Sequence, residues 1–444
     1  MIATLGSVLT ISDYTEDEAR QIKSELVTEN PNWVTAMSMG KSVWGIDQKL
    51  RFYKESDDHL TLTAPIGYLA SLKAINPLVM VVDNRYESKL PININYKHQE
   101  FPLYSYQDAA VNAMSAVENG VLCAITAAGK TVMACALIAK IAQPTLILVD
   151  TIELANQFTA RLLQFTDLQK VGRIGSGKFD VQPVTVATLQ TITRMDDDEL
   201  KQLRFGAVIV DEVHVVPAVT YARALGKLDA KFKYGLSATP ERADGLTRVI
   251  HWLTGPLVHH VPEADLADKI IKPSYTHVVT DYTYPLFDSA EYGQMITHMG
   301  TDVKRNDLIV STLSQFKTQQ CVLLCHRQEH VNLLQSLIPD SVVLLSSTKK
   351  KDREKVIKQL ETGEKRIVIT TWQLFHKGID LAELEILLIC APTKSRVWLK
   401  QSAGRLMRMS KKISKFPLIV DFADTKVDLL KYQWIARRKV LQNI

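Results

Sequence analysis

The chain has 444 residues, which corresponds to about three domains at a prior of roughly 150 residues per domain. Hydrophobic residues make up 46% of the chain, charged residues 23%, and the net charge is +5, which excludes a disordered or collagen-like protein. No apolar run reaches the roughly 18–20 residues that span a bilayer. The N-terminus also lacks a basic stretch followed by an apolar one, so we expect neither a membrane anchor nor a signal peptide.

The five cysteines argue against a disulfide framework, because their number is odd and low for this length. Cys321 and Cys325 have a spacing that resembles a metal pair, but they lie in the apolar run CVLLC. We interpret both as thiols of a buried strand, since no second cysteine pair follows nearby to complete a zinc site. A reducing cytoplasm is the expected compartment.

Charge is distributed unevenly along the chain. Residues 1–95 contain nine Lys/Arg and twelve Asp/Glu, whereas residues 391–444 contain thirteen Lys/Arg and three acids. Such local excess charge governs long-range attraction more than the total does. The C-terminal part is therefore suited to a polyanionic partner, although a solvated helical face would give the same composition.

The first 97 residues combine short apolar runs with turn signals. TEDEARQIKSEL (15–26) predicts an amphipathic helix with an acidic first turn. LRFYKESDDHLTLTAP (50–65) predicts a hairpin, because two apolar runs flank the polar KESDD. We expect a small α+β domain here.

From about residue 100, strand-like and helix-like segments alternate. The runs VLCAIT, TLILVD, VTVATL, AVIVDE and KYGLSAT are separated by helical patterns such as TVMACALIAKIA and ELANQFTARLLQF. The alternation is interrupted at 262–272 and resumes with CVLLC, SVVLLS, RIVIT, ILLIC and PLIVDF. This order predicts α/β domains with doubly wound parallel sheets. The expected domains are residues 1–97, 98–265 and 266–444.

The segment AITAAGKT (124–131) predicts a phosphate-binding loop, because it follows one predicted strand and opens a helix. Backbone N–H groups at a helix N-terminus cradle phosphates, Lys130 would reach the β- and γ-phosphates, and Thr131 would hold Mg²⁺. The segment departs from the full pattern at two positions. Ala124 stands where the pattern has glycine, and Ala127 stands where many ATPases have another. A Cβ at residue 127 restricts the backbone that glycine would leave free.

A pair of acidic residues follows the strand-like run AVIV. Asp211 and Glu212 come directly after it, at the end of a strand where parallel sheets present ligands. Asp211 would hold Mg²⁺, and Glu212 would orient and deprotonate the attacking water. A surface turn is the ordinary interpretation of such a pair, but the preceding phosphate loop favours the catalytic one.

A second glycine-rich segment, RIGSGKFD (173–180), resembles part of a phosphate loop. Phe179 stands where the required Ser or Thr would be, and no convincing apolar strand precedes the segment. We therefore expect a glycine loop that does not bind nucleotide phosphates.

Taken together, the motifs resemble those of the superfamily 2 helicases and translocases, in the same order over residues 100–444. Besides AITAAGKT and DEVH, the matching segments are YQDAA, VDTIELANQF, VTVATLQT, GLSATPERADG, VLLCHRQEH, ITTWQLFHKGID and QSAGRLMR. The resemblance implies two RecA-like lobes behind the small N-terminal domain, with ATP and Mg²⁺ as cofactors.

The resemblance also implies roles for individual residues. Gln107 would read adenine, and Arg405 and Arg408 would reach the γ-phosphate as arginine fingers, with Gln401 near the attacking water. The remaining expected nucleotide contacts are Thr126, Ala127, Ala128, Gly129, Gly378 and Asp380. Ser237, Ala238 and Thr239 would couple the two lobes. The expected nucleic-acid contacts are Thr151, Thr188, Gln190, Arg327 and Thr371.

Within the superfamily, SATPERADG and the C-terminal WIARRKVLQ are similar to the XPB-like group and to the phage UvsW-type branch-migration helicases. The segment RFYKES…LTLTAPIGYL resembles the small DNA-engaging domain that precedes the motor in those proteins. Lys41, Lys49, Arg51 and Lys54 would give this acidic domain a local basic patch. A packing or partner-binding role is the alternative.

The resemblance implies an ATP-dependent DNA helicase or translocase that acts on forks, displacement loops and four-way junctions in phage-style replication, recombination and repair. We expect it to work as a monomer on DNA, alongside replication or recombination proteins. Two alternatives stay open: an RNA helicase, and a nucleic-acid clamp that binds ATP without hydrolysing it. Ala124 and Ala127 motivate the clamp, while the intact Lys130, Asp211 and Glu212 argue against it.

Overall fold

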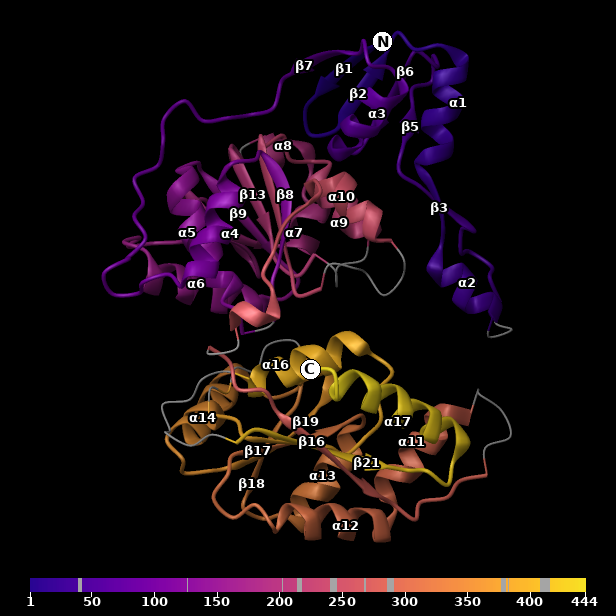
Figure 1. Cartoon of the computed structure of the whole chain (residues 1–444), viewed down its shortest axis with the longest axis vertical. Helices are drawn as coiled ribbons and strands as arrows, with labels where there is room; N and C mark the ends of the chain where they lie inside the picture. The colour runs from indigo at the N-terminus through magenta and orange to yellow at the C-terminus, as the bar shows by residue number, and fades with distance from the viewer. Residues whose placement is uncertain are drawn as a thin grey trace. The chain divides into compact units, whose positions relative to one another are not determined.

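The computed structural model describes the whole chain apart from residues 39–41, 126, 202, 214–217, 240–245, 267–268, 286–290, 377–380, 382 and 408–415. The chain forms two compact units, Met1–Pro262 and Glu263–Ile444 (Figure 1). The division falls inside the interruption that the sequence shows at 262–272. Among the described helices, none combines the length and the apolar character that crossing a bilayer requires.

The N-terminal domain is built on a five-stranded sheet with the order β5-β6-β2-β1-β7. Helix α1 begins after Thr15, whose hydroxyl accepts from the Glu18 backbone N–H while the Glu18 carboxylate accepts from the Thr15 N–H. This capping box confirms the predicted helix. Strands β5 and β6 pair as the predicted hairpin. The elements are β1 (Ile2–Leu5), β2 (Leu9–Ser12), α1 (Glu16–Glu25), β3 (Val27–Glu29), α2 (Pro31–Ser38), β4 (Lys49–Arg51), β5 (Lys54–Glu55), β6 (Thr61–Ala64), the 3₁₀ helix η1 (Ile66–Tyr68), α3 (Leu69–Ile75) and β7 (Met80–Asp83).

The rest of the first unit is a RecA-like lobe around an eight-stranded sheet with the order β11-β10-β12-β9-β13-β14-β8-β15. The pairs are parallel except for β10–β11, as alternating strands and helices predict. The elements are α4 (Ser105–Ser115), β8 (Asn119–Cys123), α5 (Lys130–Ile141), β9 (Thr145–Val149), α6 (Ile152–Phe165), β10 (Gly172–Gly175), β11 (Lys178–Asp180), β12 (Val184–Thr188), α7 (Leu189–Arg194), α8 (Asp197–Lys201), β13 (Ala207–Val210), α9 (Ala218–Leu225), β14 (Phe232–Ser237), α10 (Thr247–Thr254) and β15 (Leu257–His260).

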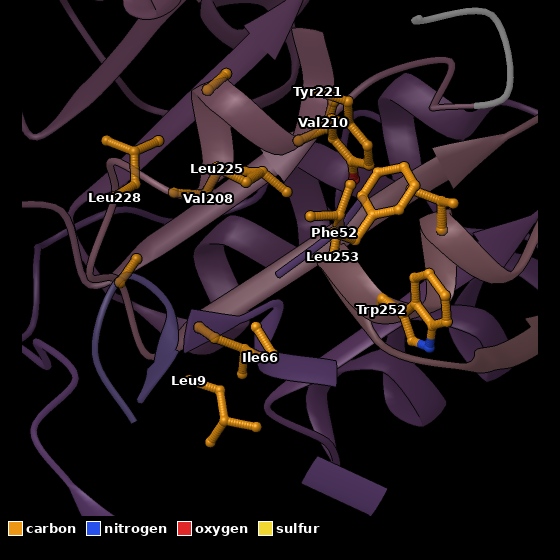
Figure 2. Packing of buried hydrophobic residues seen from close by; sticks show 14 of the residues in the cluster. Leu9, Phe52, Ile66, Val208, Val210, Tyr221, Leu225, Leu228, Trp252 and Leu253 are labelled. Atoms are coloured by element: carbon orange, nitrogen blue, oxygen red, sulfur yellow. The ribbon is translucent and has the colours of Figure 1, made fainter. Parts of the chain in front are cut away.

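The N-terminal domain and this lobe share one hydrophobic core. Leu9, Phe52 and Ile66 belong to the same buried cluster as Val208 and Trp252 (Figure 2). The rings of Phe52 and Trp252 lie with centroids 5.7 Å apart, and the edge of Tyr68 contacts Trp252 with centroids 6.4 Å apart. A Cβ on Gly67 would lie 2.2 Å from the His251 carbonyl oxygen, so η1 packs directly on the backbone of α10.

An extended segment, residues 84–104, connects β7 to α4 along the surface of the lobe. Its backbone is held at several points: Tyr86 N–H donates to the Asp229 carbonyl, Ile92 N–H to that of Ala142 and Lys97 N–H to that of Phe165. The Arg85 guanidinium, with a nearly buried side chain, contacts Asp83 and Glu118, each at 2.6 Å. The connection is therefore fixed to the lobe along its length.

The second unit is a RecA-like lobe around a six-stranded parallel sheet with the order β16-β21-β20-β17-β19-β18. Alternate residues of its strands pack into two clusters, one with α12 and α13 and the other with α15 and α16, so both faces are covered. The elements are η2 (Glu263–Leu266), β16 (Ser274–Val279), α11 (Tyr292–Thr301), α12 (Val303–Leu313), β17 (Cys321–Cys325), α13 (Gln328–Leu337), β18 (Ser341–Leu344), α14 (Lys350–Glu361), β19 (Ile367–Thr371), α15 (Trp372–His376), β20 (Ile386–Ile389), α16 (Arg396–Leu406), β21 (Leu418–Ala423) and α17 (Asp428–Leu441).

The sequence makes predictions for the five cysteines and for the glycine-rich segment 173–180. The five cysteines are buried free thiols, and Cys321 and Cys325 lie in β17 as expected. The segment 173–180 forms most of strand β10, which ends at Gly175, and all of strand β11. Strand β11 follows instead of a helix, and Ser176 and Gly177 form a two-residue hairpin turn with φ of 55° and 76°.

Candidate nucleotide site

The predicted phosphate loop lies between β8 and α5. Gly129 has φ 84° and precedes the first residue of α5, Lys130. Ala127 has φ 80°, a left-handed conformation that costs an alanine about 1–2 kcal/mol. The departure noted in the sequence is therefore a strained position of the loop. Thr126 lies outside the described residues.

Lys130 lies inside the loop. Its side chain is 9% exposed; its Nζ donates to the Ala124 carbonyl at 3.1 Å and lies 3.3 Å from Glu212 Oε1. Glu212 itself has φ 50°, so it is another left-handed residue that is not glycine, beside the loop. The structure thus brings together the lysine and the acidic residue that the two motifs supply, from segments about 80 residues apart.

Asp211 directly follows β13, and its side chain is partly exposed. Burial and the neighbouring Glu212 raise its pKa to about 7, against the opposing effect of Lys130. Such an excess of negative charge fits a divalent cation, which would stabilise both carboxylates. Thr131 lies in the first turn of α5, on the helix that follows the loop.

Gln107 and Tyr106, on α4, contact the same loop. The Gln107 Nε2 donates to the Ala128 carbonyl at 3.1 Å, and the Tyr106 hydroxyl donates to the same oxygen at 3.2 Å. The Gln107 Oε1 accepts from the Tyr104 backbone N–H at 3.0 Å. In this structure the Gln107 amide holds the loop, and its reading of adenine stays a prediction. Tyr106 was not among the residues expected from the sequence.

The triplet Ser237, Ala238 and Thr239 ends β14 next to the loop. The Ser237 carbonyl accepts from the Ala124 N–H at 2.9 Å, and the Ser237 hydroxyl donates to the Thr239 carbonyl. A backbone hydrogen bond therefore connects the triplet to the phosphate loop. Its role in coupling the lobes stays a prediction.

The five residues expected to contact nucleic acid lie at strand ends or helix starts. Thr151 and Thr188 cap α6 and α7 by accepting from Leu154 and Thr191 N–H groups. Gln190 is exposed on α7, Arg327 is exposed before α13, and Thr371 ends β19. Thr151 and Thr188 therefore have a structural role as helix caps, whatever else they contact.

The described residues of the last motif, 401–407, lie on α16 or directly after it, in the second unit. Gln401 is 7% exposed, and its Oε1 accepts no hydrogen bond within the described chain. The Arg405 guanidinium donates to the Phe375 carbonyl and lies over the Phe375 ring, 4.9 Å from its centroid. Arg408, Gly378 and Asp380 lie outside the described residues.

A cavity of about 1010 Å³ lies between the N-terminal domain and the first lobe. Its lining includes six lysine and arginine residues and one carboxylate, Asp47. The basic residues are Lys49, Arg51, Lys54, Arg223, Lys227 and the buried Lys233. The predicted basic residues 49, 51 and 54 therefore gather at one site, while Lys41 lies outside the described residues.

Two family models match the two lobes. Residues 100–242 match the Type III restriction enzyme res subunit, and residues 304–410 match the Helicase conserved C-terminal domain. Each match lies within one of the two RecA-like lobes. The fold and the loop define a protein with two RecA-like lobes and a candidate nucleotide site.

Two curated relatives narrow this class. The "DNA 3'-5' helicase XPB" of Mycobacterium tuberculosis is 28% identical over 326 residues, which cover 70% of this chain and 59% of that protein. The "DNA 3'-5' translocase XPB2" of Sulfurisphaera tokodaii is 23% identical over 356 residues, which cover 70% of this chain and 79% of that protein. The chain is similar to the superfamily 2 helicases and, among them, to these two XPB relatives. It spans about three fifths of the length of the mycobacterial relative.

One solved structure shares the fold, and a second aligns along the whole chain. A fragment of an HsdR subunit of a type I restriction enzyme from Vibrio vulnificus superposes with a TM-score of 0.56 at 18% identity, over 92% of this chain and 79% of that one. T4 UvsW aligns over the whole chain and 97% of its own, with a TM-score of 0.43 at 18% identity.

Proposed function

We propose that this chain is an ATP- and Mg²⁺-dependent DNA helicase or translocase that acts on branched DNA. The observation that carries the proposal is Lys130, buried in a phosphate loop and 3.3 Å from Glu212. A lysine and a strand-terminal carboxylate held this close are the parts that phosphoryl transfer to water requires. The names of the two XPB relatives support DNA as the polymer.

Each residue of the site has a proposed task. Lys130 and the N–H groups of Gly129 and Thr131 would bind the phosphates, and Glu212 would hold the attacking water and take its proton. Asp211 and Thr131 would hold Mg²⁺, which neutralises charge on the phosphate oxygens when bound.

The second unit supplies the remaining proposed tasks. Arg405 and Arg408 would stabilise charge at the γ-phosphate, and Gln401 would contact the water or phosphate. For Arg405 this requires release from the Phe375 carbonyl, so nucleotide binding would compete with that contact. Gly378 and Asp380 would complete the nucleotide contacts.

The experiment is steady-state ATP hydrolysis by the parent chain and Lys130→Ala. The ligands are single-stranded DNA, duplex, a fork, a four-way junction and RNA of matched length, besides a sample without nucleic acid. We expect stimulation strongest on forks and junctions, and loss of turnover in the variant. Stimulation by RNA alone would favour an RNA helicase. ATP binding without turnover on any ligand would favour the clamp.

We also propose that DNA enters the cation-lined cavity of the first unit. Each DNA phosphate that a basic side chain neutralises adds about 0.9 to the steepness with which the logarithm of the binding constant falls against the logarithm of the salt concentration. Arg51→Gln with Lys54→Gln should therefore weaken fork binding and lower the salt slope by up to about 2. Lys73→Gln with Lys89→Gln makes the same charge change outside the cavity and serves as control. Equal losses in both pairs would contradict a specific role of the cavity.

A further inference from the structure

The phosphate loop contains two left-handed residues with a buried alanine between them. Ala127 has φ 80° and Gly129 has φ 84°, whereas Ala128 is fully buried. Gly129 reaches this conformation without penalty, but Ala127 does not, because its Cβ crowds the backbone. The loop therefore needs other contacts to hold the shape that presents its N–H groups to phosphate.

Two side chains of α4 supply such contacts at a single atom. The Ala128 carbonyl accepts from the Tyr106 hydroxyl at 3.2 Å and from Gln107 Nε2 at 3.1 Å. That carbonyl belongs to the peptide that joins Ala128 to Gly129, next to Ala127. A rotation of the loop out of the left-handed conformation at Ala127 would disturb both hydrogen bonds.

Gln107 also sets how closely α4 approaches the phosphate loop. A Cβ built on Gly129 would lie 2.6 Å from Gln107 Nε2, so the loop and the amide are in direct contact. Tyr106 is 6% exposed, and burial raises the pKa of its hydroxyl to about 12, so it stays a proton donor at physiological pH. Its ring also stacks on Tyr104, with centroids 5.7 Å apart, which fixes the direction of the hydroxyl.

We infer that Tyr106 is a positioning residue that holds the strained, alanine-containing phosphate loop in its phosphate-binding shape. The inference rests on the proposed ATP site and adds a residue to it. Tyr106 acts through the Ala128 carbonyl, so it contributes equally to any ligand that carries the same phosphates. An adenine contact would instead favour adenine nucleotides alone.

The test measures equilibrium binding to full-length protein of ATP, GTP and inorganic triphosphate. Tyr106→Phe removes one hydrogen bond and keeps the ring, so the Kd should rise about fivefold for all three ligands. Ala127→Gly removes the cost of the left-handed conformation and should bind at least as tightly as the parent. In the Ala127→Gly background the effect of Tyr106→Phe should shrink below twofold, because the loop then keeps its shape unaided.

Tyr234→Phe is the matched control. Tyr234 is another buried tyrosine of the same unit, and its hydroxyl donates to a backbone carbonyl, that of Val117, at 2.8 Å. Its loss should lower the melting temperature without the phosphate-specific change in Kd. Lys130→Ala, measured in parallel, reports on the site itself: unchanged ATP binding there would contradict the proposed function rather than the role of Tyr106.

Three outcomes would overturn the inference. An unchanged Kd in Tyr106→Phe would show that the hydrogen bond is dispensable. A loss confined to ATP would assign Tyr106 to adenine. A fivefold loss that persists in the Ala127→Gly background would show that Tyr106 does not act on the strain at residue 127.

Discussion

Lys233 is a charged residue in the interior of the first unit. It is 1% exposed, and its Nζ donates to the carbonyls of Ser7 and Leu225 at 3.3 and 3.4 Å. Burial lowers the pKa of this ammonium from 10.5 to about 7, with Arg85 adding repulsion and Asp229 opposing it. Because Ser7 belongs to the N-terminal domain and Leu225 to the lobe, the lysine connects the two.

This residue should make stability depend on pH. Between pH 7 and 10.5 the unfolded lysine keeps its proton while the folded one has lost it, so the unfolded state binds more protons. The free energy of unfolding therefore rises with pH across this window. We expect the melting temperature of the first unit to increase from pH 7 to 10, and Lys233→Met to lose that part of the slope. Parallel curves for the two proteins would refute the assignment.

Glu212 is the residue to which we assign the proton from water. Glu212→Gln should lower ATP turnover by about 10²–10⁴-fold, since an amide cannot accept that proton. ATP binding should persist, because Lys130 and the loop are unchanged. Radiolabelled ATP hydrolysis beside nucleotide binding gives the comparison, with the exposed Glu100→Gln as control. A loss of binding as large as the loss of turnover would argue for a structural role.

At the scale of elements, Arg305 connects α12 to the sheet of the second unit. Its Nε lies 2.8 Å from Asp424, just after β21, and its Nη1 donates to the Cys390 carbonyl at 2.8 Å. Thr280 donates to the same carboxylate at 2.6 Å. Both side chains of the ion pair are 1% exposed, so neither charge has water as a substitute partner.

Arg305→Met should destabilise the second unit by about 3–5 kcal/mol, because it leaves the Asp424 carboxylate buried without its partner. Chemical denaturation measures the loss. Arg20→Met removes an ion pair at 2.6 Å whose two side chains are 74% and 88% exposed, and it should change stability little. Equal effects of the two substitutions would show that burial does not control the strength of these pairs.

The sequence predicts elements best where both faces of a strand are buried. Strands β9, β12 and β13 are buried at every residue, and each was predicted from its β-branched or apolar run. The β10–β11 hairpin was not, since its segments are short and β11 is largely exposed. Likewise, motif spacing predicts Lys130, Asp211 and Glu212, whereas the contact of Tyr106 with Ala128 depends on how α4 packs against the loop.

At the scale of the whole molecule, the chain consists of two units with separate cores. The first includes the N-terminal domain, because Trp252 of α10 packs against Phe52 and Tyr68. We expect calorimetry to resolve two transitions, with residues 1–97 unfolding together with the first lobe. A third transition for the N-terminal domain would contradict the shared core.

Trp252→Ala tests this assignment. It should lower the stability of the first unit by about 3–5 kcal/mol, because it removes a large buried ring, and leave the second transition in place. Arg305→Met should lower the stability of the second unit and leave the first transition in place, so each variant is the control for the other. Calorimetry with limited proteolysis of residues 1–97 provides the measurement. A shift of both transitions in either variant would argue against separate units.

The shared core also constrains how the chain acquires its structure during synthesis. Tyr68 emerges from the ribosome roughly 180 residues before Trp252 emerges, which at about 5–20 residues per second is a delay of roughly 10–40 s. During that interval the apolar face formed by Leu9, Phe52 and Ile66 has no partner from α10. The nascent N-terminal domain is thus a natural client for chaperones, and its release should coincide with the emergence of residues 247–254.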